Sequence, residues 1–180
     1  MSVKLPTGEE MEILFDADTL RRRTRALAAE ISGANFEKLL VVPILKGSFV
    51  FGADLLRALH DAGLYPEVDF LFLSSYGEGT ASKGTVRVLR GIEADVAGRD
   101  VLLVDDILES GRTLAYARDL IMAAGARRVA TCILLDKLVD RAVQVTADFC
   151  GFECPDVFVV GYGMDLAHRF RELPYVGRIV

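Results

Sequence analysis

The segment VLLVDDILESGRT, residues 101–113, combines residue types that could bind a phosphorylated sugar. An apolar run is followed by two adjacent carboxylates and then by a small-residue turn that leads into a predicted helix. Free N–H groups at a helix N-terminus bind phosphate, and Gly111 lets the backbone approach the anion closely. Paired carboxylates accept hydrogen bonds from sugar hydroxyls or help to hold Mg²⁺. The same residues could form an ordinary helix N-cap at Ser110, and spacing alone does not decide between the two.

The composition of the chain limits the class of protein. Its 180 residues fit one domain, which we expect to span residues 1–180, and 52% of them are hydrophobic, too many for a disordered chain. The net charge of −5 argues against a general nucleic-acid binder. No apolar stretch approaches the roughly 20 residues of a membrane span, and the N-terminus lacks the apolar region of a secretory signal. We therefore expect neither nucleic-acid nor membrane partners.

The cysteines give a second indication of the cellular compartment. Cys132, Cys150 and Cys154 are few and odd in number, which predicts free thiols in a reducing cytoplasm. Cys150 and Cys154 form a C-x₃-C pair, but the chain has only two histidines and no second cysteine pair. We therefore expect buried core cysteines rather than a zinc site.

Alternating elements must position the candidate residues. Apolar runs at 39–45, 68–76, 101–104, 129–135 and 156–162 predict strands, and 85–91 predicts one more after a glycine-rich loop at 77–84. Helices are predicted over 16–31, 48–63 and 114–125. Continuous apolar runs are typical of strands buried on both faces. The pattern predicts an α/β fold with a mostly parallel central sheet flanked by helices, whose ligands gather at the carboxyl ends of the strands.

The segment at 101–114 resembles the phosphoribosyl-diphosphate signature of the type I phosphoribosyltransferases. Three further segments, ILKGSFVFGADLL at 44–56, SSYGEGT at 74–80 and DFCGFECPDVFVVGYGMD at 148–165, are similar to the hypoxanthine-guanine branch. The resemblance runs from about the first helix to Arg171. It implies the type I phosphoribosyltransferase fold with a small hood formed by the termini. It also implies transfer of 5-phosphoribosyl to N9 of hypoxanthine or guanine, which gives IMP or GMP and pyrophosphate with Mg²⁺ as cofactor.

The resemblance assigns binding of phosphoribosyl diphosphate to four places. Asp105 and Asp106 match the pair that binds the ribose hydroxyls, and the loop that holds the 5′-phosphate is matched by Ser110, Gly111, Arg112 and Thr113. Lys46 and Gly47 match the loop that meets the pyrophosphate, and Arg171 matches an arginine that reaches it. In this family the peptide bond before the lysine of the pyrophosphate loop is often cis. We therefore expect a cis bond between Leu45 and Lys46.

The resemblance also assigns the purine end of the site. Lys137 matches the donor to the purine 6-oxo group, Phe158 the residue that stacks on the base, and Val159 the residue whose backbone reads the base edge. Asp165 matches a carboxylate beside the purine that binds Mg²⁺, which would share this role with Asp105 and Asp106. Alone, each of these residues has an ordinary structural explanation, so their assignment depends on the family.

A flexible loop over about residues 75–85 is implied as well. Ser75 and Tyr76 match its start, and the family closes this loop over the reaction. Closure would keep water away from the cation-like reaction centre.

Two acids depart from the usual family pattern. Asp105 stands where many relatives have glutamate, and Glu109 stands where aspartate is usual. Glu109 is the candidate catalytic base for the proton of purine N7. Its side chain is one methylene longer than aspartate, so the sequence leaves its reach open.

Two alternatives remain at this stage. The nearer is a phosphoribosyltransferase that prefers xanthine or guanine, because a lysine that reads a 6-oxo group serves all three bases. The farther is a nucleic-acid-binding regulator on the same fold, against which the net charge of −5 argues. Relatives are usually dimers or tetramers, so we expect a homodimer or homotetramer.

Overall fold

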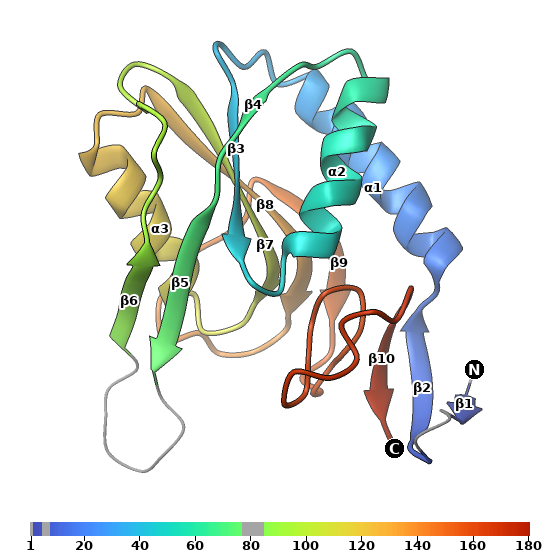
Figure 1. Ribbon diagram of the computed structural model, residues 1–180. Coiled ribbons are helices and arrows are strands. Elements are labelled where there is room, and N and C mark those ends of the chain that lie inside the picture. Colours follow the sequence, from blue (N-terminus) through green and yellow to red (C-terminus); the bar gives the residue numbers. More distant parts are fainter. Residues whose placement is uncertain (1, 5–7, 77–84) are drawn as a thin grey trace.

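The centre of the computed structural model, which describes residues 2–4, 8–76 and 85–180, is a mostly parallel sheet (Figure 1). The strand order is β6-β5-β3-β7-β8-β9, and β4 pairs with β3 beside this path. Only β5 and β6 pair antiparallel; the other pairings are parallel. The strands are β3 (Leu40–Leu45), β4 (Glu67–Val68), β5 (Leu71–Tyr76), β6 (Thr85–Arg90), β7 (Asp100–Leu108), β8 (Arg128–Lys137) and β9 (Phe149–Cys154). The predicted fold class is confirmed.

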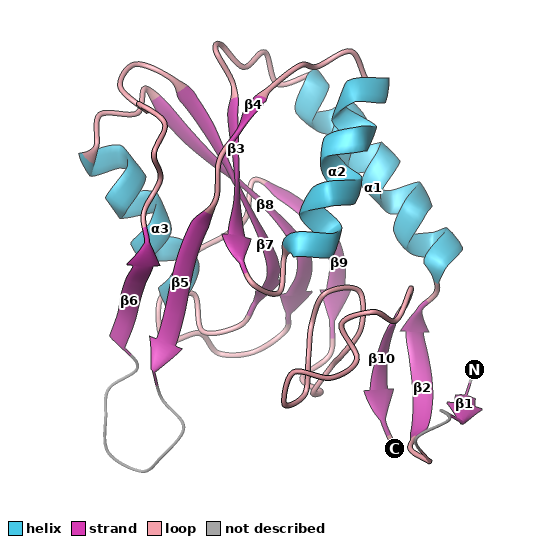
Figure 2. Cartoon of the chain, viewed as in Figure 1, coloured by secondary structure: helices cyan, strands magenta, loops and turns pink. Residues whose placement is uncertain are grey.

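Helices cover both faces of the sheet, which explains the continuous apolar runs of its strands. The helices α1 (Ala17–Ser32) and α2 (Phe49–Asp61) pack on one face, and α3 (Arg112–Ala123) packs on the other (Figure 2). Within β3, Val41 belongs to the core under α1 and α2, whereas Leu40 belongs to the core under α3. Alternate side chains are thus buried on opposite faces.

The three helices lie within two residues of their predicted ranges. Asp16 caps α1 by accepting a hydrogen bond from the backbone N–H of Thr19 at 2.7 Å. No helix in the described part of the chain is long and apolar enough to cross a membrane. The three cysteines are free thiols, and Cys132 and Cys154 are buried in the core as predicted, whereas Cys150 is partly exposed.

Two predicted strand ends are wrong because strand hydrogen bonding continues into polar residues. The strand predicted at 101–104 is the nine-residue β7, so Asp105 and Asp106 belong to the strand and not to a loop that follows it. The strand predicted at 129–135 extends through Lys137 in β8, where the ladder with β9 pairs Lys137 with Cys154.

Two other predicted strands are also wrong. The run at 68–76 is split into β4 and β5. The run at 156–162 is no strand of the central sheet: Val160 forms an isolated bridge to Gly177, and Gly161 and Tyr162 have φ of 96° and 51°. Such left-handed conformations interrupt a strand. The edge of the sheet is formed instead by β9, which the sequence analysis missed.

The terminal segments form a second, smaller sheet. It contains β1 (Ser2–Lys4), β2 (Glu10–Phe15) and β10 (Val176–Ile179) in the order β1-β2-β10. Met11, Val160 and Phe170 form a small core that joins this sheet to the looped segment 155–175. We call the small sheet and residues 155–175 the hood. In Figure 1 the hood lies beside the carboxyl ends of the central strands.

Candidate functional site

The carboxyl ends of three neighbouring strands bring distant residues to one edge of the sheet. The parallel register pairs Pro43 of β3 with Val104 of β7, and Val104 in turn with Cys132 of β8. Residues that follow these positions therefore lie side by side. They include the loop after β3, the two carboxylates in β7 and the lysine at the end of β8.

A cavity of about 580 Å³ opens at this edge. The residues that it shares with the sequence-based predictions are Lys46, Gly47, Asp106, Glu109, Lys137, Phe158, Val159, Asp165 and Arg171. They come from the ends of three central strands and from the hood. Asp105 and the turn at 110–113 do not line the cavity but adjoin it in the chain.

The turn that leads into α3 contains a backbone position, Gly111, that favours glycine. Gly111 has φ of 76° and is the N-cap of α3, so the ordinary cap at Ser110 is not formed. A Cβ on Gly111 would also lie 2.2 Å from the carbonyl oxygen of Val143. The N–H of Arg112 lies 3.4 Å from Ser110 Oγ, which is long for a hydrogen bond. The helix N-terminus is thus suited to an anion. Thr113 lies in the first turn of α3.

The loop that follows β3, with Lys46 and Gly47, is held from two sides. The bond between Leu45 and Lys46 is cis, as expected. A Cβ built on Gly47 would lie 1.8 Å from Asp106 Oδ2, and a Cβ on Gly163 would lie 2.2 Å from the carbonyl oxygen of Gly47. Only glycines at both positions allow the carboxylate, the loop and the hood to pack this closely.

The two adjacent carboxylates of β7 strongly disfavour full ionisation. Burial, and then the charge of Asp106, raise the pKa of Asp105 well above its usual range. Burial also raises the pKa of Asp106, although hydrogen bonds and the charge of Arg171 act in the opposite direction. A cation near the pair would relieve this repulsion.

The donor set of this pair fits Mg²⁺. Carboxylate oxygens are its preferred protein ligands, and Mg²⁺ is usually held by one or two carboxylates together with substrate phosphates and water. Asp165 does not join Asp105 and Asp106 in this site as expected, because the described residues contain no cluster of three or more His, Cys, Asp or Glu side chains that could hold a metal.

One end of the cavity holds a buried ammonium group. The Lys137 side chain is 7% exposed, and its Nζ lies 3.1 Å from Glu109 Oε1 and 3.9 Å from Asp156 Oδ1. Phe158 is 59% exposed although it is large and apolar, whereas Val159 is buried. An exposed aromatic ring at the rim of a cavity is suited to stacking on a planar ligand.

The hood brings a cation to the other end of the cavity. Arg171 Nη2 lies 2.6 Å from Asp165 Oδ1, and Arg171 Nη1 donates to the carbonyl oxygen of Gly163 at 2.6 Å. The other Asp165 oxygen accepts a hydrogen bond from the N–H of His168 at 2.7 Å. Asp165 therefore positions Arg171 in the structure.

The sequence analysis missed several residues that line the cavity. These are Phe72, Leu73, Ser74, Leu89, Ile107, Met164 and His168. The Lys46 ammonium lies 5.6 Å from the centroid of the Phe72 ring, and Ser74 Oγ is buried without a hydrogen-bond partner. Period-two alternation along β5 could have identified Phe72 and Ser74 as neighbours on one face.

Part of the predicted flexible loop lies outside the described residues. Ser75 and Tyr76 are the last residues of β5, and β6 begins at Thr85. Residues 77–84 are not among those that the structure describes.

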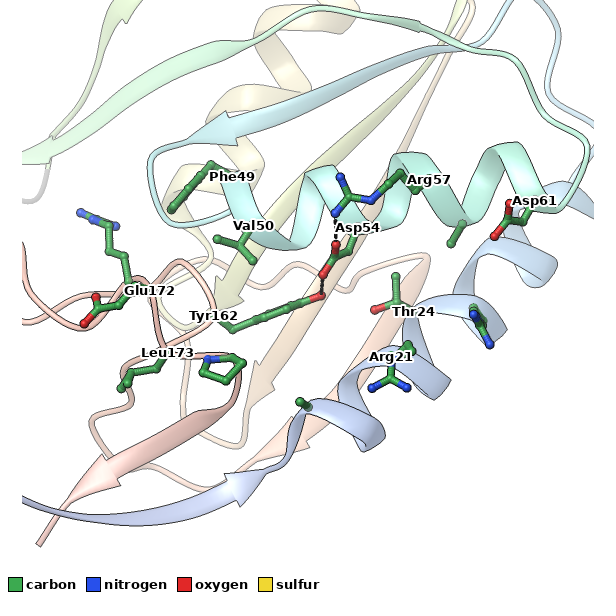
Figure 3. Close-up of a pocket in the computed structure, with 15 residues that line it drawn as sticks. Arg21, Thr24, Phe49, Val50, Asp54, Arg57, Asp61, Tyr162, Glu172 and Leu173 are labelled. Carbon is green, nitrogen blue, oxygen red and sulfur yellow. Dashed lines mark hydrogen bonds and ion pairs between the residues drawn. The ribbon is translucent and has the colours of Figure 1, made fainter. Parts of the chain in front are cut away.

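A larger cavity, of about 850 Å³, lies between α1, α2 and the hood (Figure 3). Among the predicted site residues only Arg171 lines it. Figure 3 shows Asp54 between Arg57 and Tyr162, and the Tyr162 hydroxyl donates to Asp54 Oδ2 at 2.6 Å. We place the chemistry in the smaller cavity, because that cavity holds the carboxylate, the two lysines and the exposed aromatic ring.

Comparisons with known proteins agree with this arrangement. A family model described as a phosphoribosyl transferase domain matches residues 11–167. The hypoxanthine-guanine phosphoribosyltransferase of Aquifex aeolicus is 41% identical over 171 residues, which are 94% of this chain and 94% of that protein. A crystal structure of a hypoxanthine-guanine phosphoribosyltransferase from Bacillus anthracis has a TM-score of 0.86 and 37% identity, and the match covers 94% of this chain and 98% of that one.

A further relative is much longer than this chain. The bifunctional protein TilS/HprT of Listeria innocua is 45% identical over 168 residues, which are 92% of this chain but only 25% of that protein. Because the family model covers most of the residues that build the sheet and its carboxyl edge, the chain belongs to the phosphoribosyltransferase family.

Proposed function

We propose that this protein transfers the 5-phosphoribosyl group from phosphoribosyl diphosphate to N9 of hypoxanthine or guanine in purine salvage. The products are IMP or GMP and pyrophosphate. The observation that carries the proposal is the single cavity in which a strand-end carboxylate, the pyrophosphate loop, a buried lysine and an exposed aromatic ring meet. The names of the similar proteins from Aquifex aeolicus and Bacillus anthracis support the same activity.

The phosphoribosyl end is bound by groups of opposite character. Asp105 and Asp106 accept hydrogen bonds from the ribose hydroxyls, and the turn at 110–113 holds the 5′-phosphate at the N-terminus of α3. Lys46 and Arg171 neutralise the pyrophosphate as it leaves. Asp105 and Asp106 would hold Mg²⁺ together with substrate phosphates, and Mg²⁺ when bound supplies further charge stabilisation to the leaving group.

The purine end selects the base by hydrogen bonding. An ammonium has three donors and no acceptor, so Lys137 can pair with a 6-oxo group but not with a 6-amino group. Phe158 stacks on the base, and the backbone of Val159 reads the base edge. Adenine has no acceptor oxygen at C6, so Lys137 gains no hydrogen bond from this base, and such a mismatch strongly reduces the rate for the wrong substrate.

Glu109 is the proposed proton acceptor. In a 6-oxopurine the oxo group at C6 and the N7 atom are neighbours on one edge of the ring. The Lys137 ammonium and the Glu109 carboxylate are likewise neighbours, with Nζ and Oε1 3.1 Å apart. A donor for the oxo group and an acceptor for the N7 proton are thus available side by side. A lower kcat for Glu109→Gln, with a changed pH–rate profile, is the result expected from this role.

The proposal also includes closure of the loop at about 75–85 over the reaction. It further includes a cytoplasmic location and self-association. Three free cysteines favour a reducing compartment. A homodimer or homotetramer is supported by the 850 Å³ cavity, which presents four arginines and three carboxylates that suit a second copy with the same charges. The residues are Arg21, Arg25, Arg57, Arg171, Asp54, Asp61 and Glu172. Light scattering after size exclusion tests this assembly.

The test is Mg²⁺-dependent release of pyrophosphate from phosphoribosyl diphosphate, with hypoxanthine, guanine, xanthine and adenine supplied in turn. We expect turnover with hypoxanthine and guanine and very little with adenine. A clear preference for xanthine would instead establish the xanthine alternative. Efficient turnover of adenine, or no release with any base, would refute the proposal.

A further inference from the structure

The lysine proposed to read the purine has an acidic partner in the structure. Lys137 Nζ lies 3.1 Å from Glu109 Oε1, and the two side chains are 7% and 54% exposed. Asp156 is more distant from the ammonium, at 3.9 Å, and its side chain is 68% exposed. Glu109 is therefore the main partner of this buried cation.

We propose that Glu109 masks Lys137 in the free enzyme, and that a base binds only by taking the ammonium away from this carboxylate. The inference rests on the proposed function, because it assumes that Lys137 donates to a 6-oxo group. It adds a competition to that function: one ammonium serves either Glu109 or the purine oxygen. Glu109 then contributes to base selection in addition to its proposed role as proton acceptor.

The physical reason is the cost of an unpaired buried charge. An ammonium that is 7% exposed is stable only with an acceptor, and Glu109 supplies one until substrate arrives. A 6-oxopurine replaces that acceptor with its own oxygen. A purine without the oxo group cannot replace it, so Lys137 stays with Glu109. The half-exposed Glu109 carboxylate remains hydrated in place when the ammonium leaves it, so the exchange does not leave an unpaired buried anion.

The exchange also orders the events of the reaction. While Glu109 is paired with Lys137, its carboxylate is occupied by a cation. Once the oxo group takes the ammonium, the carboxylate is released beside purine N7, at the moment when a base with an N7 proton is present. The proton acceptor is thus unmasked by the correct substrate.

The experiment compares two nucleotides that differ at C6 and in the N1 proton that accompanies the oxo group. IMP carries the oxo group, and purine riboside 5′-monophosphate carries hydrogen there. Isothermal titration gives the ratio of their dissociation constants for the native protein, Glu109→Gln and Glu109→Ala. Contacts of the phosphate, the ribose and N7 are common to both ligands and cancel in the ratio. The N1 proton of IMP has the same surroundings in the native protein and in the variants, so the change in the ratio between these proteins reports the contribution of Lys137 and its partner.

We expect both variants to favour IMP over the oxo-free nucleotide more strongly than the native protein does, by about two- to fivefold. This is the range for a partly exposed ion pair converted to an affinity ratio. The gain should vanish in a Lys137→Ala background, because the double-mutant cycle then removes the shared ammonium. Glu153→Gln, which neutralises an exposed acid on β9, is the matched control and should leave the ratio unchanged.

An unchanged or smaller ratio in both Glu109 variants would overturn the masking. Melting curves check that the variants are folded. If Glu109→Gln is not folded, Glu109→Asp, whose carboxylate is one methylene shorter and pairs less well with Lys137, should raise the ratio in the same direction. Failure of the proposed function gives a different result, since the native protein would then neither bind IMP nor release pyrophosphate with hypoxanthine.

Discussion

Replacing Gly47 by alanine should separate activity from folding in this protein. The new Cβ would lie 1.8 Å from Asp106 Oδ2 and 2.6 Å from Asp106 Cγ. Real Cβ atoms essentially never come within 3.0 Å of another heavy atom, so the carboxylate must move by more than 1 Å. The obstacle is a side chain rather than backbone, and we therefore expect the fold to survive while Asp106 leaves its place.

The size of the effect follows from the displacement. Moving a positioning group by about 1 Å lowers a rate by roughly 10²-fold, which corresponds to about 2.7 kcal/mol of transition-state stabilisation. Overpacking by one methyl group in a close-packed region costs about 1–3 kcal/mol of unfolding free energy, or a few degrees in Tm. The loss of activity should thus be far larger than the loss of folded protein.

The assay is pyrophosphate release at varied phosphoribosyl diphosphate, together with a thermal melt of the same sample. Gly91→Ala is the matched control. Gly91 also lies outside the left-handed region, and a Cβ built there meets no atom within 4 Å. That variant should keep native kinetics and native Tm. A Gly47→Ala protein whose kcat/KM for phosphoribosyl diphosphate stays within threefold of native would refute the reasoning, because Asp106 could then move without consequence.

Three further variants test other parts of the structure. Lys137→Ala should lower kcat/KM for hypoxanthine by about 10- to 100-fold, because it removes one charge-assisted hydrogen bond. The KM for phosphoribosyl diphosphate should change little, and a parallel loss for both substrates would contradict the role of Lys137. The raised pKa of Asp105 keeps a proton on the folded protein that the unfolded chain has lost, so the stability of the protein falls as pH rises above the usual pKa of 3.8. Without Mg²⁺, Asp105→Asn should therefore raise Tm near pH 7 and not near pH 3. Equal shifts of Tm at both pH values would contradict this. Tyr162→Phe should cost about 1 kcal/mol by removing the hydrogen bond to Asp54, and an unchanged urea midpoint would count against that bond.

The sequence by itself determined the class of the fold and the outline of the site. Apolar runs are local patterns, and a strand buried on both faces, such as β3 or β7, must be apolar along most of its length. The segment at 101–113 was identified as a possible phosphate site from residue types and spacing alone, because a helix N-terminus and its preceding turn are also local features. The purine-binding residues, in contrast, were reached only through the family resemblance.

Strand ends and the hood could not be derived in this way. Asp105, Asp106 and Lys137 are polar, but the hydrogen bonds of neighbouring strands extend β7 and β8 through them. The apolar run at 156–162 resembles a strand, yet its positive φ angles and its contacts with Phe170 and Met11 make it part of the hood. Burial of apolar side chains is compatible with either arrangement, so hydrophobicity does not distinguish them.

Only the tertiary structure decided which side chains touch. The pairing of Lys137 with Glu109 depends on the register of β8 against β7, and the packing of Gly47 between Asp106 and Gly163 depends on where the hood folds back. These contacts join segments that are far apart in the chain. A local sequence pattern specifies which face of an element is apolar, whereas strand order, register and loop path are set by the packing of the whole molecule.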